Sequence, residues 1–160
     1  MKIYIASSWK NEKECKEIAR GLRDDGHEVD GFCDESTGRF VFHWSELVKS
    51  EEDLKNFNAI SFLADERTQK AFKEDKKWLD WADTVLLVLP AGNSAHLEAG
   101  YKKGQGGKLF IYGPFPKGQF DVMYGFADGL FSWADLELMR VTLLECSEKL
   151  EIERKAGRKN

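Results

Sequence analysis

The chain has 160 residues and a formal net charge of −4, with 42% hydrophobic and 32% charged residues. These values are typical of one globular domain with its own core, and they indicate neither disorder nor a membrane protein. The acidic balance gives no electrostatic basis for binding a nucleic-acid polymer, and every apolar run is too short to span a bilayer. We expect a single domain over residues 1–154 and a frayed tail over residues 155–160.

The cysteines and histidines give no metal or redox pattern. Cys15, Cys33 and Cys146 lie far apart, so no zinc or redox spacing exists, and the three histidines form neither HxH nor HExxH. Reduced thiols in a cytoplasmic protein are the simplest interpretation. Because GxGxxG, GxxxxGK[ST] and GxSxG are also missing, we expect no bound cofactor, no P-loop and no α/β-hydrolase elbow.

The chain begins with a strand–helix–strand pattern. Residues 2–6 form a short apolar run, residues 11–24 have the spacing of an amphipathic helix, and residues 27–32 are a second candidate strand. Such a unit predicts two parallel strands joined by a right-handed crossover.

The middle of the chain is less regular. We expect a loop over residues 33–42 and helices over residues 44–56 and 59–82. Aromatic residues gather near the loop without helical or clean strand spacing: Phe40, Phe42 and Trp44. Two interpretations stay open, since these side chains can pack on the core or form the wall of a site for a flat ligand.

Residues 84–89 are a continuous apolar run that predicts a strand buried on both faces. A turn follows, and Ser94 is a candidate N-cap for a helix over residues 95–103. Glu98 then falls in the first turn, where backbone N–H groups and the helix dipole are expected to favour its ionised form. It is a candidate nucleophile at the end of a strand, although an ordinary first-turn Glu is the more common case.

The last part of the chain repeats the pattern. Residues 109–112 and 129–132 are candidate strands, and residues 121–126 a helical turn. Ser132 and Asp135 form a variant capping box for a helix that runs to about Arg154. The element order predicts an α/β fold: a doubly wound parallel sheet of about five strands with helices on both faces.

Three residues spread along the chain suggest a chemistry. Tyr4 and Glu98 fall on elements expected to be neighbours, so the phenol can hold the carboxylate in place, and Asp75 can supply a second acid. Two carboxyls in different environments suit glycosyl transfer, with one as nucleophile and the other as general acid. His96 is expected to have a surface or capping role, and Cys33 to be a buried thiol.

These residues also carry a family resemblance. Tyr4 in KIYIASSW, Asp75 in EDKKWLDWAD and Glu98 in NSAHLEAG, followed by GGKLFIY, resemble the nucleoside 2-deoxyribosyltransferase superfamily. This superfamily includes 2′-deoxynucleoside 5′-monophosphate N-glycosidases and cytidylate hydrolases, and the likeness covers roughly residues 1–128. It implies a flavodoxin-like fold and no cofactor. It also implies a homodimer or higher homo-oligomer in which a neighbouring subunit completes each site.

The resemblance implies roles for individual residues. Glu98 would attack the anomeric carbon to form a covalent sugar ester, Asp75 would transfer a proton to the leaving base, and Tyr4 would hydrogen-bond the nucleophile. Trp9 would line the base pocket. The remaining substrate-binding residues implied are Ser7, Gly92, Asn93, Ser94, Asp121 and Met123. The substrate would be a small-molecule nucleoside or nucleotide, and the ester would be resolved by a second base or by water.

Two departures from the family pattern affect the substrate and the acceptor. Gly92 and Asn93 stand where transferases carry an acidic pair, which favours hydrolysis over base exchange. Ser94 can contact a 5′-phosphate from the helix N-terminus, whereas the Asp121 carboxylate would repel phosphate and accept a hydrogen bond from a free 5′-OH. Two non-enzymatic alternatives stay open: a nucleotide-binding module without turnover, and an interaction domain built on the aromatic middle segment.

Overall fold

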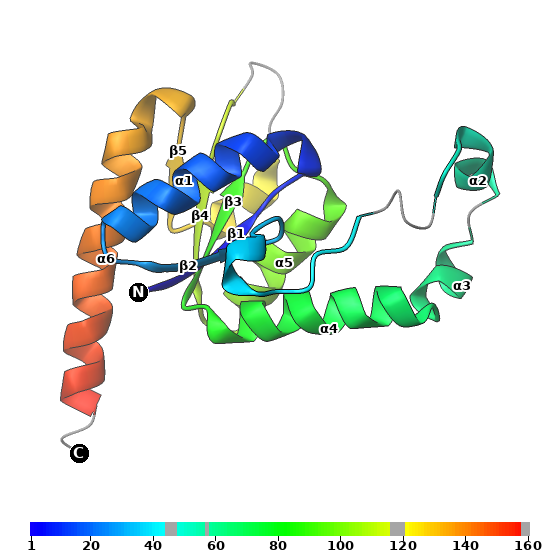
Figure 1. The fold of residues 1–160 in the computed structure, drawn as a ribbon. Helices are drawn as coiled ribbons and strands as arrows, with labels where there is room; N and C mark the ends of the chain where they lie inside the picture. Colours follow the sequence, from blue (N-terminus) through cyan, green and yellow to red (C-terminus); the bar gives the residue numbers. More distant parts are fainter. Residues whose placement is uncertain (44–47, 57, 116–120, 158–160) are drawn as a thin grey trace.

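A five-stranded parallel sheet forms the centre of the computed structural model, which describes residues 1–43, 48–56, 58–115 and 121–157 (Figure 1). The strands are β1 (Lys2–Ala6), β2 (Glu28–Gly31), β3 (Thr84–Val88), β4 (Lys108–Tyr112) and β5 (Gly129–Phe131). They are arranged in the order β2-β1-β3-β4-β5, and neighbouring strands pair in parallel. This strand order is that of flavodoxin-like proteins, so the predicted fold class is confirmed.

Helices cover both faces of the sheet (Figure 1). On one face, α1 (Glu12–Asp24) and α6 (Leu136–Gly157) contribute Leu22 and Leu143 to a core that contains Ile3 and Val88. On the other face, α4 (Glu66–Trp81) and α5 (Asn93–Gly104) pack their apolar side chains on the opposite sides of the same strands. The central strand β3 is buried along its whole length, as its unbroken apolar sequence predicts.

The two-residue period of β1 determines which side chains meet α4 and α5. Ile3 and Ile5 point to the face of α1 and α6, whereas Tyr4 and Ala6 point to the opposite face. A phenol hydroxyl is thereby placed within an apolar layer. It needs a polar partner there, because an unpaired buried hydroxyl is costly.

Two of the predicted helices differ from the structure. The helix expected over residues 44–56 is α2 (Glu51–Lys55); residues 48–50 are not helical and residues 44–47 lie outside the described residues, with Trp44 among them. The helix expected over residues 59–82 is divided into α3 (Ala59–Leu63) and α4. The physical reason is Asp65, whose carboxylate accepts from the backbone N–H groups of Arg67 and Thr68 at 2.9 and 3.4 Å and starts a new helix.

Short 3₁₀ turns connect several of these elements: η1 (Trp9–Asn11), η2 (Glu35–Thr37), η4 (Val122–Phe126) and η5 (Trp133–Asp135). The predicted capping box is present, since the backbone N–H of Ser132 donates to Asp135 Oδ2 at 2.9 Å. Helix α6 continues past Arg154 to Gly157, so residues 155–157 are helical rather than frayed, and residues 158–160 lie outside the described residues.

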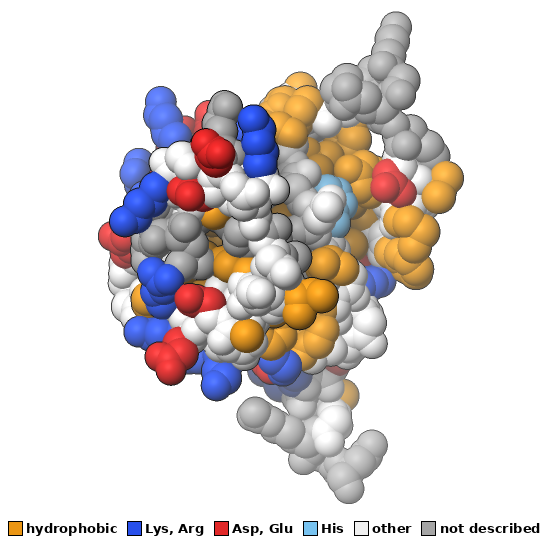
Figure 2. Space-filling model, turned by 90° about the vertical axis from the view of Figure 1, so that its right-hand side faces the viewer, with side chains coloured by type: hydrophobic (Ala, Val, Ile, Leu, Met, Phe, Trp, Pro, Cys, Tyr) orange, Lys and Arg blue, Asp and Glu red, His pale blue; other side chains and the backbone are white. Residues whose placement is uncertain are grey.

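Helices α2 and α3 lie on an arm that projects from the sheet beyond the end of α4 (Figure 1). Large hydrophobic side chains are exposed on α3 and α4, among them Ile60, Leu63 and Phe72. Viewed from that side, hydrophobic side chains gather on one half of the molecule, while charged side chains of both signs are mixed on the other (Figure 2). Among the residues that the structure describes, no helix combines the length and apolar character needed to cross a bilayer.

Candidate active site

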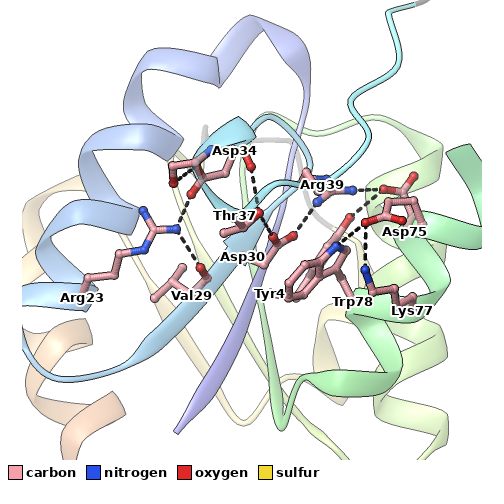
Figure 3. Close-up of polar contacts among 12 residues, drawn as sticks. Tyr4, Arg23, Val29, Asp30, Asp34, Thr37, Arg39, Asp75, Lys77 and Trp78 are labelled. Atoms are coloured by element: carbon pink, nitrogen blue, oxygen red, sulfur yellow. Dashed lines mark hydrogen bonds and ion pairs between the residues drawn. The ribbon is translucent and has the colours of Figure 1, made fainter.

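The three predicted catalytic residues lie together on the face of the sheet that α4 and α5 cover. Tyr4 is fully buried on β1, and its hydroxyl donates to Asp75 Oδ1 on α4 at 3.5 Å (Figure 3). Glu98, half-buried on α5, is near enough to both for the Tyr4 hydroxyl and the Asp75 charge to shift its pKa. Three separate elements therefore bring a phenol and two carboxyls to one place.

An arginine that the sequence did not single out joins this cluster. Arg39 donates from Nη1 to Asp30 Oδ1 at 2.6 Å and from Nη2 to Asp75 Oδ1 (Figure 3). Its side chain is only 1% exposed, and that of Asp30 is 0% exposed. Buried charges of this kind are tolerated only when they are paired. Removal of Arg39 or of Asp30 alone would therefore leave an unpaired buried charge and destabilise the fold.

The sequence offered a signal for this pair. Arg39 is the one Lys or Arg between residues 24 and 48 of the printed sequence, and Asp30 interrupts the otherwise apolar end of a strand. A buried acid in a strand requires a cation nearby. The pairing itself depends on how the loop after β2 folds back, which no periodicity indicates.

Glu98 does not sit where the sequence placed it within its helix. Helix α5 begins at Asn93 with Gly92 as the N-cap, and Ser94 is not the cap. Glu98 is therefore in the second turn, farther from the free backbone N–H groups than expected. The helix dipole has little effect at that distance, because it acts mainly within the first turn.

The protonation of Glu98 also differs from the expectation. The pKa of Glu98 is raised to about 8, mainly by burial and also by the charge of Asp75, while Arg39 and the Tyr4 hydroxyl act in the lowering direction. Burial likewise raises the pKa of Asp75, with Arg39 opposing it. At neutral pH Glu98 therefore carries a proton in the free protein for most of the time, because desolvation disfavours its charged form.

Ser7 connects the carboxyl ends of β1 and β3. Its hydroxyl donates to the carbonyl oxygen of Val88 at 2.7 Å. Asn11 Nδ2 donates to Ser7 Oγ at 2.9 Å and to the carbonyl oxygen of Pro90 at 2.8 Å. These bonds connect the end of β1 to the turn that leads from β3 into α5. Ser7 therefore stabilises the backbone next to the site.

Trp9 lies in an aromatic group beside the loop after β2. Its ring meets Phe32 edge-on at 5.1 Å and lies 4.3 Å from His43 at a tilt of 33°. Phe42 faces Phe62 of α3 at 6.4 Å between ring centroids. The loop thus packs its aromatic side chains on one another. Trp9 is also an aromatic ring of the kind that a base can stack on.

The remaining predicted contacts lie at the start of α5 and on η4. Gly92, Asn93 and Ser94 are exposed where α5 begins. His96 Nδ1 is 2.8 Å from the carbonyl oxygen of Gly92, and its ring stacks on Tyr124 of η4. These contacts hold His96 between the start of α5 and η4.

Met123 belongs to η4 and Asp121 is the N-cap of that turn, so neither residue is part of the carboxylate cluster. The Asp121 carboxylate caps this turn by accepting from the backbone N–H of Met123 at 2.8 Å. Both side chains are exposed, and η4 is linked to α5 through the contact of Tyr124 with His96.

Two further features bear on what the site can bind. Within residues 1–43, 48–56, 58–115 and 121–157, no group of three or more His, Cys, Asp or Glu side chains is arranged to hold a metal ion.

A cavity of about 250 Å³ lies between α1 and α6, lined by Leu22, Tyr112 and Met139 among others. It is on the other face of the sheet from the two carboxyls, so it is not part of the candidate site.

The fold and the cluster define a flavodoxin-like α/β protein with paired acids at the face of the sheet under α4 and α5. Solved structures with the same fold include a 2-deoxyribosyltransferase from Bacillus psychrosaccharolyticus (TM-score 0.54, 21% identity, 86% of this chain and 90% of that chain). Another is the CMP N-glycosidase BcmB of Clostridium botulinum (TM-score 0.53, 11% identity, 89% of this chain and 98% of that chain). Neither a protein-family model nor a curated protein matches the sequence. The resemblance expected from the sequence is thus confirmed at the level of the fold.

Proposed function

We propose that this protein is a cytoplasmic enzyme that cleaves the N-glycosidic bond of a nucleoside or a nucleoside 5′-monophosphate. The observation that carries the proposal is the meeting of Glu98 and Asp75 beside the buried hydroxyl of Tyr4, with the two carboxyls in unequal environments. Glycosyl transfer needs this combination of one acid and one nucleophile. The shared fold with a deoxyribosyltransferase and a CMP N-glycosidase supports it.

In the proposed reaction the pair holds one proton, which moves from Glu98 to Asp75 as substrate binds. The Glu98 carboxylate forms a bond to the anomeric carbon while the bond from that carbon to the base breaks, and Asp75 gives its proton to the departing ring nitrogen. Water then cleaves the sugar ester, which frees the sugar and the Glu98 carboxylate and returns a proton to Asp75. Tyr4 donates a hydrogen bond that keeps the nucleophile oriented.

We favour water over a second base as the final acceptor. Gly92 and Asn93 carry no acidic side chain at the exposed start of α5, where the base reader of transferases would lie. Asn93 offers an amide, which can bind substrate polar groups but supplies no charge. A base-exchange activity would therefore be weaker than hydrolysis.

The group at the 5′ position of the sugar is recognised by one of two arrangements. Ser94 lies at the N-terminus of α5, whose backbone N–H groups attract a phosphate. Asp121, exposed on η4, would instead accept from a free hydroxyl. We also propose a homodimer, because Leu97 of α5 and Val122 and Phe126 of η4 expose large apolar surfaces that a second copy would cover.

A chromatographic screen tests the proposal. Nucleosides and 5′-monophosphates, in ribo and deoxy form, are incubated with the protein with and without an acceptor base, and release of free base is measured. Glu98→Gln should lower base release by about 10³-fold or more while the circular dichroism spectrum is unchanged. Base release at the wild-type rate in that variant would overturn the proposal.

A second candidate function is a nucleotide-binding module without turnover. It is favoured by one observation, the raised pKa of Glu98, since a protonated carboxyl is a hydrogen-bond donor and a poor nucleophile. Intact-mass measurement after mixing with substrate separates the two candidates. A mass increase equal to the sugar minus one water, the value for a glycosyl ester, that is lost in Glu98→Gln excludes the binding module.

A further inference from the structure

Arg39 occupies a position that the proposed reaction does not yet explain. It lies in the loop between η2 and α2, yet its guanidinium reaches across to α4 and lies 5.7 Å from the centre of the Tyr4 ring. Its two terminal nitrogens contact Asp30 and Asp75, and its Nε is buried without a hydrogen-bond partner. Among the described contacts, the hydrogen bonds that orient this guanidinium are those to its two aspartates.

The far side of Arg39 is firmly anchored. Asp30 on β2 receives a hydrogen bond from Thr37 Oγ1 at 2.6 Å, in addition to the one from Arg39. Thr37 belongs to η2, which Asp34 caps, and Asp34 is itself paired with Arg23 of α1 (Figure 3). A continuous polar network thus leads from α1 to the Asp75 carboxyl, and Arg39 is its last member.

Arg39 contacts one oxygen of Asp75, and that same oxygen accepts from Tyr4. Within the part of the chain that the structure describes, Tyr4 and Arg39 both bond the first oxygen of Asp75 and neither bonds the second, so the second oxygen is the one that we assign to the substrate. Because a guanidinium cannot release its proton in a protein, the contact with Arg39 permanently favours the ionised form of Asp75.

We propose that Arg39 is a positioning residue: it fixes which oxygen of Asp75 faces the substrate and determines how one proton is divided between Asp75 and Glu98. This inference rests on the proposed function, in which that proton must be on Asp75 when the base departs. Arg39 contacts neither the sugar nor the base and acts through Asp75.

The charged groups around the pair come from four segments. Asp75 faces Tyr4 of β1, Arg39 of the loop after η2 and Glu74 of its own helix, and Glu98 faces Asp75, Arg39 and Tyr4. Arg39 lowers the pKa of both carboxyls, whereas Glu74 raises that of Asp75. Removing the guanidinium must therefore raise both pKa values.

The variant that tests this is Arg39→Met combined with Asp30→Asn, because Arg39→Met alone would leave the buried Asp30 carboxylate unpaired. An amide at position 30 can still accept from Thr37. The reaction needs a singly protonated pair, so its rate rises as the first proton leaves and falls as the second leaves. Both limbs of the pH profile of kcat should move upward by about one pH unit in the double variant.

Arg39→Lys separates charge from geometry. A lysine keeps the positive charge but cannot hold two carboxylates at once in a fixed plane. Its pH profile should stay near that of the wild type while kcat falls by about tenfold, with KM changed less. Arg140→Met is the matched control, since it removes an arginine paired with Asp25 on the other face of the sheet.

A substrate whose base needs no proton to leave tests whether Arg39 acts on proton transfer. If Arg39 had a purely structural role, its replacement would affect both kinds of substrate equally. With an ordinary substrate the double variant should also lose kcat, and with a 7-methylated purine, or a 5-fluorinated pyrimidine for an enzyme that accepts only pyrimidines, that loss should be about tenfold smaller. An equal loss with both kinds of substrate, or unshifted pH limbs, would overturn the inference.

Carbon-13 NMR of the aspartate carboxyls tests the role of Arg39 without requiring turnover of a substrate. The Asp75 signal, assigned with Asp75→Asn, should titrate about one pH unit higher in the double variant than in the wild type. If the wild type releases no base from any substrate, the proposed function fails, and the NMR titration alone decides the role of Arg39. An unchanged titration would then refute it.

Discussion

The charge of Asp75 on α4 raises the pKa of Glu98 on α5, in addition to the larger effect of burial. The protonation of one acid of the candidate site therefore depends on the charge of the other, which lies on a different helix. This relationship has consequences for stability as well as for chemistry, because the fold holds Glu98 in a state that the unfolded chain does not favour.

Stability should fall as the pH rises past the ordinary pKa of a Glu. The pKa of Glu98 is raised from 4.5 to about 8, so between these values the folded protein binds a proton that the unfolded chain has lost. The free energy of unfolding then decreases with pH, by at most about 1.4 kcal/mol per pH unit, and the loss is complete above the folded pKa. Urea titrations of wild type and Glu98→Gln from pH 5 to pH 8 measure this.

Glu98→Gln should abolish most of that slope and leave the variant more stable than the wild type at pH 8. Glu148→Gln, at an exposed position on α6, is the matched control and should keep the wild-type slope. Parallel stability curves for wild type and Glu98→Gln would contradict the prediction.

Gly113→Ala should destabilise the protein strongly. Gly113 has a φ of +150°, and a Cβ there would lie 2.7 Å from the Cβ of Leu89 and 2.9 Å from its carbonyl oxygen. Strain and backbone contact together should lower the free energy of unfolding by about 2 kcal/mol or more. Gly100→Ala in α5, where a Cβ meets nothing within 4 Å, should instead be neutral or slightly stabilising. Similar midpoints for the two variants in thermal unfolding would disprove this.

Asp65→Ala should cost about 1 kcal/mol of stability, since α4 would lose the carboxylate that accepts from its first backbone N–H groups. Asp65→Asn keeps an acceptor and should stay close to the wild type. Chemical denaturation compares the three proteins. Should the Ala and Asn variants be equally stable, the cap would not be what begins α4.

Trp9→Ala should raise KM for the preferred substrate by about tenfold, with a smaller change in kcat, if a base stacks against this ring. Phe72→Ala is the control, because Phe72 is an aromatic residue exposed on α4. Initial-rate measurements on both variants are sufficient. A fall in kcat at constant KM would place Trp9 outside the base-binding surface.

The sheet and most of its helices were predictable because their hydrophobic patterns are strong. The unbroken apolar run of β3 and the amphipathic spacing of α1 each indicate one kind of element. The expected neighbouring of the elements that carry Tyr4 and Glu98, together with the family resemblance for Asp75, also predicted that the three would meet. Elements predicted from long, regular apolar patterns form as expected, because burial of their apolar faces is what drives folding.

What the sequence did not reveal depends on tertiary contacts. Asp65 divides a predicted helix through a local cap that the apolar stripe conceals. The ionisation of Glu98 was argued from its own helix, whereas burial under neighbouring elements decides it. Arg39 follows a glycine in a loop without period, and only the folded loop brings it to Asp30 and Asp75.

The candidate site is complete only when several distant segments of the domain have folded together. Its parts come from β1, the loop after η2, α4 and α5, and the contact of Tyr4 with Asp75 alone spans 71 positions of the chain. No short fragment contains the cluster, because its members lie on segments far apart in the sequence that meet only in the folded domain, where β1 pairs with β3. During refolding, recovery of activity should therefore trail the recovery of helical signal, since contacts between distant segments form late.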